Sequence, residues 1–178
     1  TVSFMLPVPI STICFPGNTP IKTDQGKILI KDLKEKEHTI DGKRIVCVTR
    51  TVTEEKYLTC LEKESLGENM PSKRTIMSGR HKLLYKGKMI ESKYLVGKIE
   101  KVNKIIYSGE TLYNVLMESH GEMIVNNLKC ETLDPESDIG IIHLLLLKLT
   151  NANKIKLIKR LNEEKMTIID MNRIRRLV

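Results

Sequence analysis

The sequence predicts an all-β domain followed by a short α-helical extension at its C-terminal end. From about residue 12 to residue 135, short segments alternate apolar and polar side chains, and turn-forming residues separate them. After Pro135 the apolar residues recur at the spacing of a helix instead. Aromatic residues make up only 4% of the 178 residues, so we expect a core of leucine, isoleucine, valine and methionine.

Nine short segments have the composition and alternation expected of strands. They are residues 21–23, 28–30, 45–52, 57–61, 81–85, 88–90, 99–107, 111–117 and 122–128. The turn signals between them are Asp24-Gln25-Gly26, Asp41-Gly42, Lys86-Gly87-Lys88 and Ser108-Gly109. Strands this closely spaced, with no helical pattern between them, indicate an all-β domain.

Helical segments are expected after the β domain. Residues 139–149 are mostly apolar and predict a short helix that is buried on most of its faces. Thr150 and Asn151 can cap a second, amphipathic helix over residues 152–165. Residues 171–177 predict a last helical piece. The chain therefore divides into an upstream segment of residues 1–13, a β domain of residues 14–135 and an extension of residues 136–178.

The chain carries a formal net charge of +8, and its basic residues are concentrated in residues 151–178. This balance permits weak binding to nucleic acid or to an anionic membrane without requiring either. The scarcity of aromatic side chains for base stacking argues against a nucleic-acid partner, and a basic helix face is more often simply solvated. No apolar run reaches about 18 residues, so no transmembrane helix is expected.

Four cysteines, Cys14, Cys47, Cys60 and Cys130, are spread widely along the sequence. No Cys-x-x-Cys pair occurs, so neither a disulfide framework nor a zinc site is expected. Buried free thiols in a reducing, intracellular compartment explain Cys47 and Cys60, because a free cysteine packs as a small apolar residue. Cys14 and Cys130, in contrast, lie within sequence motifs.

Three segments carry motifs that point to chemistry. The first begins at Cys14, runs CFPGNTPIKT to residue 23, and continues to a second strand that ends in Asp32-Leu33. In the second segment, Ser78-Gly79-Arg80-His81 precedes an apolar strand and a short hairpin. The third segment contains LYNVL at residues 112–116 and MIVNNL at residues 123–128.

In this order, the three segments resemble the sequence blocks of the Hint superfamily, the self-processing domains of hedgehog proteins and inteins. The family's first block opens with a cysteine and passes through Gly, Asp or Asn, and Thr; here Asn18 stands where Asp is usual. The second block of the family is Thr-x-x-His, and here Ser78 keeps the hydroxyl of the threonine. The resemblance covers residues 14 to about 135, or roughly two-thirds of the chain.

The resemblance implies a flat all-β Hint fold with pseudo-two-fold halves, which places Cys14 in a central cleft. It also implies a reaction, in which the thiolate of Cys14 attacks the carbonyl carbon of Ile13. His81 would donate a proton to the departing amide nitrogen, and Ser78 would hold that nitrogen or the scissile carbonyl by a hydrogen bond. This N-to-S acyl shift leaves a thioester and implies no metal or organic cofactor.

Protein splicing, as inteins perform it, is not expected. Splicing needs His-Asn followed by Ser, Thr or Cys, and the alignment puts Glu131, Thr132 and Leu133 at those positions. Thr132 cannot form a succinimide, and Leu133 cannot accept an acyl group. We therefore expect hedgehog-type cleavage in cis, which acts on the chain's own upstream segment. A small acceptor would resolve the thioester: water, a thiol, an amine or an alcohol.

Three further residues are accessory candidates. Cys130 precedes the end of the last block and could exchange acyl groups or form a disulfide with Cys14, although a bland buried thiol is commoner. His120, in the turn before the last strand, could assist catalysis or simply lie on the surface. Asn114 stands where inteins often have an Asp that handles the thiol proton, and its neutrality argues against that assistance.

Two other functions remain open from the sequence. Ile13 is β-branched and hinders attack on its own carbonyl, and Ser78 and Asn114 depart from the residues usual in the family. The chain could therefore be a catalytically inactive Hint-fold module with a structural or interaction role. Salt-sensitive binding to DNA or RNA would instead favour a basic nucleic-acid-binding domain.

Overall fold

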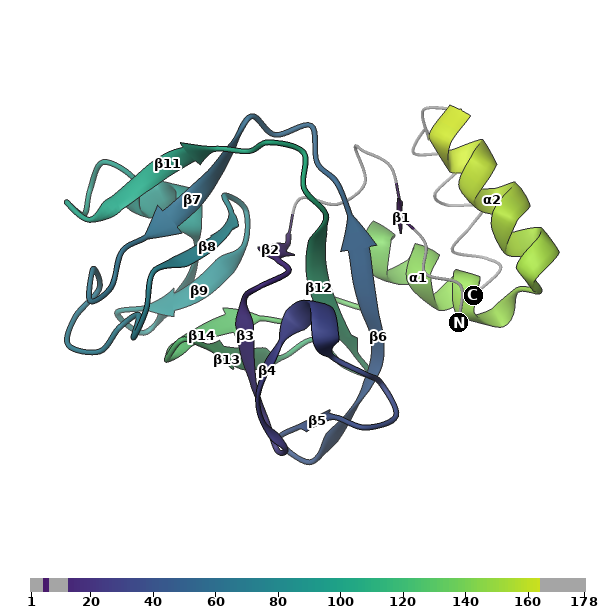
Figure 1. The fold of residues 1–178 in the computed structure, drawn as a ribbon, viewed down its shortest axis with the longest axis horizontal. Coiled ribbons are helices and arrows are strands. Elements are labelled where there is room, and N and C mark those ends of the chain that lie inside the picture. The colour runs from purple at the N-terminus through teal and green to yellow at the C-terminus, as the bar shows by residue number, and fades with distance from the viewer. Residues whose placement is uncertain (1–4, 7–12, 164–178) are drawn as a thin grey trace.

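The computed structural model describes residues 5–6 and 13–163, where the chain forms a mostly β fold that ends in two helices (Figure 1). The predicted fold class is therefore confirmed. The strands are β1 (Met5–Leu6), β2 (Phe15–Pro16), β3 (Pro20–Thr23), β4 (Gly26–Leu29), β5 (Thr39–Ile40), β6 (Lys43–Thr51), β7 (Tyr57–Leu61), β8 (Thr75–Ser78), β9 (Lys82–Tyr85), β10 (Lys88–Glu91), β11 (Val102–Ile106), β12 (Leu112–Met117), β13 (Glu122–Val125) and β14 (Leu128–Glu131).

These strands form three sheets within the described part of the chain. The first sheet has the order β1-β6-β12-β2, with β5 paired to β6. The second has the order β10-β9-β14-β13-β3-β4, and the third has the order β11-β7-β8. The first and third sheets share two long stretches of chain, because β6 continues into β7 and β11 continues into β12 (Figure 1).

The two halves of the β domain repeat the same elements. A hairpin followed by a 3₁₀ turn opens each half: β3–β4 with η1 (Ile30–Asp32), and β9–β10 with η2 (Ser92–Leu95). The two hairpins form opposite edges of the six-stranded sheet. Each half then extends a long arm, and the arms pair antiparallel with each other, β12 with β6 and β11 with β7. This exchange of arms is the pseudo-two-fold arrangement that the resemblance to Hint domains implies.

The main core is aliphatic, as the composition predicts. Phe15 and Tyr113 are the aromatic side chains among its buried members. The others that are almost fully buried include Ile21, Ile30, Ile45, Leu61, Met77, Leu83, Val102, Val115, Met123, Val125 and Leu128. A separate, smaller cluster holds Cys14 together with Leu58 and Leu112.

Two helices follow the last strand, α1 (Asp138–Lys148) and α2 (Asn151–Glu163). Ser137 caps α1 by accepting a hydrogen bond from the backbone N–H of Gly140. Thr150 accepts one from the N–H of Asn153 at the start of α2, which confirms it as a capping residue. The helical piece expected over residues 171–177 lies outside the described residues.

The first helix packs against the β domain. Ile142 and Leu145 of α1 belong to an apolar cluster with Leu116 of β12 and Leu133, which follows β14. This shared cluster places one face of α1 against β12 and the segment that follows β14. In the described part of the chain, neither helix has the length and apolar composition needed to cross a membrane.

The structure corrects the sequence reading at the third motif. Residues 122–128 were expected to form one strand, but β13 ends at Val125 and β14 begins at Leu128. Asn126 and Asn127 form the hairpin turn between them with φ angles of 45° and 68°, a left-handed conformation that asparagine tolerates better than most residues. The register of the hairpin gives β14 a place beside β9, directly next to the segment that carries His81.

Candidate active site

Cys14 lies between two strands that come from different halves of the domain. Its carbonyl oxygen accepts a hydrogen bond from the N–H of Ser78 at the end of β8 (3.0 Å). The following residue, Phe15, pairs with Tyr113 of β12. Cys14 is only 1% exposed, and its side chain packs in the small cluster with Leu58. The backbone around Cys14 is therefore fixed from both sides.

Gly17 in the first motif permits the close packing of the turn that follows β2. A Cβ added to Gly17 would lie 2.9 Å from Cε2 of Tyr113 and 3.3 Å from Cβ of Lys31. A side chain at this position would push the turn away from β12, on which β2 depends for pairing. The glycine of the motif therefore has a structural reason that is linked to the placement of Cys14.

Both polar atoms of the Ile13–Cys14 peptide bond form hydrogen bonds with side chains. The N–H of Cys14 donates to Oγ of Ser78 at 2.8 Å. The carbonyl oxygen of Ile13 accepts from Nδ2 of Asn114, also at 2.8 Å. A peptide bond in a strand normally has backbone partners. Here the hydroxyl of Ser78 and the amide of Asn114 take those places, so side chains contact both the N–H and the carbonyl oxygen of this peptide bond.

The orientation of the Asn114 amide is determined by its own backbone neighbour. Oδ1 accepts a hydrogen bond from the N–H of Val115 at 2.8 Å, so the oxygen of the amide must face that N–H and the NH₂ group faces Ile13. Asn114 is buried, at 1% exposure. An aspartate here would present only acceptors when ionised. The neutrality of Asn114 therefore suits a donor to the Ile13 carbonyl.

His81 is buried and held from one side. A turn through Gly79 and Arg80 brings its N–H to the carbonyl of Ser78 (3.0 Å), and its ring lies 4.2 Å from the ring of Phe15 between centroids. The Nε2 atom donates to the carbonyl oxygen of Glu131 at 2.9 Å. Because a carbonyl only accepts, Nε2 carries the proton and Nδ1 has a free lone pair. Among the described residues, Nδ1 has no hydrogen-bond partner.

Burial lowers the pKa of His81 to about 4, against smaller opposing effects from the backbone of Glu131 and of Cys14. The imidazole is therefore neutral at pH 7. In this state the ring is a proton acceptor. The role predicted from the sequence, proton donation to the leaving nitrogen, requires that the ring first take up a proton.

Glu131 is a residue of the site that the sequence reasoning used only to exclude splicing. Its carbonyl holds His81, and its side chain is buried. Oε1 accepts from the N–H of Lys82, next to His81, and Oε2 lies 3.1 Å from Nε2 of His120. The signal available in the sequence was its position in the alignment, where the resemblance to inteins placed the histidine of the His-Asn pair.

The remaining candidates occupy different places. His120 is about half exposed and reaches the site only through Glu131. Cys130 is fully buried in the main core opposite Leu83, and burial raises the pKa of its thiol. Cys14 belongs to the separate small cluster. None of the four cysteines takes part in a disulfide bond.

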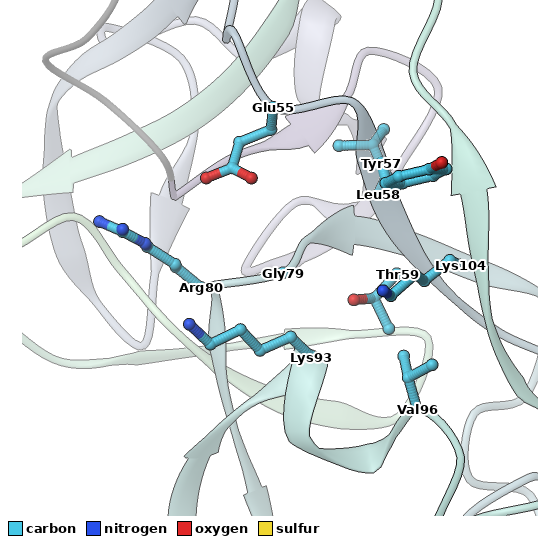
Figure 2. Close-up of a pocket in the computed structure, with 9 residues that line it drawn as sticks. All are labelled: Glu55, Tyr57, Leu58, Thr59, Gly79, Arg80, Lys93, Val96 and Lys104. Carbon is cyan, nitrogen blue, oxygen red and sulfur yellow. The ribbon is translucent and has the colours of Figure 1, made fainter.

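A cavity of about 270 Å³ borders Gly79 and Arg80, the two residues between Ser78 and His81 in the sequence (Figure 2). Three consecutive residues of β7, Tyr57, Leu58 and Thr59, line it, and Leu58 also packs in the small apolar cluster with Cys14. The lining residues are Glu55, Tyr57, Leu58, Thr59, Gly79, Arg80, Lys93, Val96 and Lys104.

No metal-binding cluster of three or more His, Cys, Asp or Glu side chains occurs in the described residues. The polar groups around Cys14 are instead single hydroxyl, amide and imidazole groups, each directed at the backbone. Such a set can polarise a carbonyl, hold a nitrogen and move a proton.

Neither a protein-family model nor a curated protein matches this sequence. Solved structures do. The fold is similar to that of inteins. A DnaB intein from Synechocystis sp. PCC 6803 is 14% identical with a TM-score of 0.47, over 68% of this chain and 99% of that chain. The MchDnaB-1 intein is 14% identical with a TM-score of 0.45, over 66% of this chain and 98% of that chain. The gp41-1 intein is 14% identical with a TM-score of 0.42, over 67% of this chain and 98% of that chain. At this identity the similarity concerns the fold alone.

Proposed function

We propose that the chain cleaves its own backbone between Ile13 and Cys14 by an N-to-S acyl shift, and that an external nucleophile then resolves the thioester. The observation that carries the proposal is the pair of side-chain hydrogen bonds on this one peptide bond, Asn114 to its oxygen and its N–H to Ser78. The residue after the bond is a cysteine, whose sulfur is a nucleophile suited to acyl transfer.

The reaction balances with the residues present. Neutral His81 accepts the thiol proton of Cys14, and the thiolate forms a bond to the carbonyl carbon of Ile13. Asn114 stabilises the negative charge that develops on the carbonyl oxygen. As the carbon–nitrogen bond breaks, His81 returns the proton to the nitrogen, which Ser78 holds. The products are a thioester on Cys14 and the free α-amino group of the same residue.

Cleavage without splicing is the second part of the proposal. The family positions for the terminal His-Asn and the downstream nucleophile hold Glu131, Thr132 and Leu133 in this sequence. Leu133 is buried under α1 and has no nucleophilic group. The acceptor is therefore an external molecule, namely water, a thiol, an amine or an alcohol, and the segment upstream of Cys14 leaves.

A catalytically inactive module with a structural or interaction role is the alternative function, and one observation favours it. Cys14 is 1% exposed, so an external acceptor has little access to the thioester in this conformation. The β-branched side chain of Ile13 adds further hindrance at the carbonyl.

Intact mass spectrometry of the purified chain decides between the two functions. The chain is incubated with and without dithiothreitol, beside a Cys14→Ala control. We expect loss of residues 1–13 that dithiothreitol accelerates and that Cys14→Ala abolishes. A mass that stays unchanged after long incubation with thiol would contradict the cleavage and favour the inactive module.

A further inference from the structure

A short strand upstream of the proposed cleavage bond is paired into the first sheet. β1 runs parallel to β6, with Met5 opposite Arg50 and Leu6 opposite Thr51. β6 would otherwise present an open edge there, and an open edge can accept another extended chain. The upstream segment therefore occupies a site that is built for a strand.

The chain downstream of the bond lies in the same sheet. Thr51 pairs with Leu112 of β12, and Leu112 pairs with Pro16 of β2. Since Leu6 pairs with Thr51 on the other side, these four residues fall in one row across the sheet. A strand upstream of the Ile13–Cys14 bond and a strand downstream of it are thus paired into the same sheet, in the same row of residues.

A second element contacts the upstream strand from outside the sheet. α2 touches β1, so β1 lies between β6 and this helix (Figure 1). α2 belongs to the helical extension that follows the β domain. Its contact with β1 links the extension to the segment that is cut away.

We propose that the edge of β6 and helix α2 together form a docking site for the polypeptide upstream of the cleavage bond, which binds as an added strand. The site recognises an extended backbone, because strand pairing uses N–H and C=O groups that are common to all residues except proline, which lacks the N–H. The consequence for rate rests on the proposed cleavage: a bond anchored on both sides keeps its geometry for attack.

Proline substitution of the upstream strand tests the docking site through cleavage. In the double variant Met5→Pro/Leu6→Pro, the strand loses its N–H donors, and we expect dithiothreitol-dependent cleavage to slow about tenfold. The matched control, Met5→Ala/Leu6→Ala, keeps the backbone donors and should cleave within about threefold of the wild-type rate. Equal rates for the proline and alanine variants would overturn the proposal.

Amide hydrogen exchange tests the same site without cleavage, on the full chain with Cys14→Ala. Backbone N–H groups alternate in direction along a strand, so one of the Arg50 and Thr51 amides faces β1 and the other faces β12. The double proline substitution should speed exchange at one of these amides by about tenfold or more and leave the other slow. The slow amide reports that the sheet is still folded.

The helix has its own test. Lys156 is exposed on α2, and Lys156→Pro breaks the helix, whereas Lys156→Ala preserves it. We expect the proline variant, unlike the alanine variant, to speed exchange at the amide of β6 that faces β1. If the proline variant leaves the exchange rate of this amide unchanged, α2 is not part of the docking site, and the proposal in this form is overturned.

The two sets of measurements separate the failure of each proposal. A wild-type chain that does not cleave, while the proline variants still change exchange on β6, would refute the cleavage and keep the docking site. A chain that cleaves with dithiothreitol, while the proline variants change neither rate nor exchange, would keep the cleavage and refute the docking site.

Discussion

Asn114 forms a 2.8 Å hydrogen bond with the carbonyl oxygen of Ile13, where negative charge develops if Cys14 attacks. A single donor of this kind is typically worth 10²- to 10³-fold in rate when it is held in place before the reaction. The bond from Val115 to Oδ1 supplies that restraint, since the amide cannot rotate without losing it. At the residue scale, Asn114 is therefore the group that distinguishes this peptide bond from its neighbours.

We predict that Asn114→Asp lowers the cleavage rate by about 10²-fold. The variant has the same shape and still accepts from Val115, but its carboxylate cannot donate to the Ile13 oxygen. The measurement is the time course of intact mass in dithiothreitol, together with far-UV circular dichroism to verify folding. A folded variant that cleaves at the wild-type rate would show that the bond to Asn114 does not assist the reaction.

The sequence could single out Cys14, Ser78 and His81 as candidates, because each lies within a short motif. It could not say which atom each one touches. Asn114 is 101 positions from Ile13, and Glu131 is 50 positions from His81, so these contacts depend on the folded sheet order. The sequence interpretation of Asn114 considered only proton transfer. Its partner, a carbonyl oxygen, appears only in three dimensions.

At the scale of elements, most strands followed from alternation and turn residues. The strand β8 (Thr75–Ser78) was missed because it directly follows a polar loop. The hairpin between β13 and β14 was missed because an Asn-Asn pair is a weaker turn signal than Asn-Gly. Both omissions concern strands whose stability comes from their partners, β7 for β8 and β9 for β14.

The packing of helix α1 leads to a prediction about where the folded domain ends along the chain. Ile142 is fully buried in the cluster with Leu116, so Ile142→Ala should lower the free energy of unfolding by about 2–5 kcal/mol. Leu147→Ala, on the half-exposed face of the same helix, should change it by less than about 0.5 kcal/mol. Urea unfolding followed by circular dichroism gives both values.

Equal, small effects of these two substitutions would mean that α1 contributes nothing to the stability of the β domain. The extension would then begin a separate unit, as the sequence division at residue 136 allows. A large effect of Ile142→Ala alone would instead include α1 in the domain.

At the scale of the whole molecule, two buried histidines make stability depend on pH. Burial lowers the pKa of both His81 and His143 to about 4. In the unfolded chain, the pKa of a histidine is about 6.5. Between these values the unfolded chain binds more protons than the folded one, so acid favours unfolding. The stability is fully present above about pH 6.5 and is lost as the pH falls toward 4.

We predict that the free energy of unfolding decreases between pH 7 and pH 5 by about 2 kcal/mol for each of the two histidines. Urea titrations at the two pH values measure the difference. The variant His143→Leu removes one titrating group far from Cys14 and should remove about half of this dependence. The same pH dependence in the variant and the wild type would show that His143 does not titrate in this range.

The exchange of arms between the two halves has a consequence for the timing of the proposed reaction. Chains are synthesised from the N-terminus, so Cys14 leaves the ribosome well before Asn114 and Glu131 do. A growing chain therefore carries its nucleophile without the carbonyl donor on β12 and without the residue on β14 that holds the histidine. In the proposed reaction, the bond before Cys14 would therefore stay intact throughout translation of the β domain, and cleavage would begin only on a chain completed through β14.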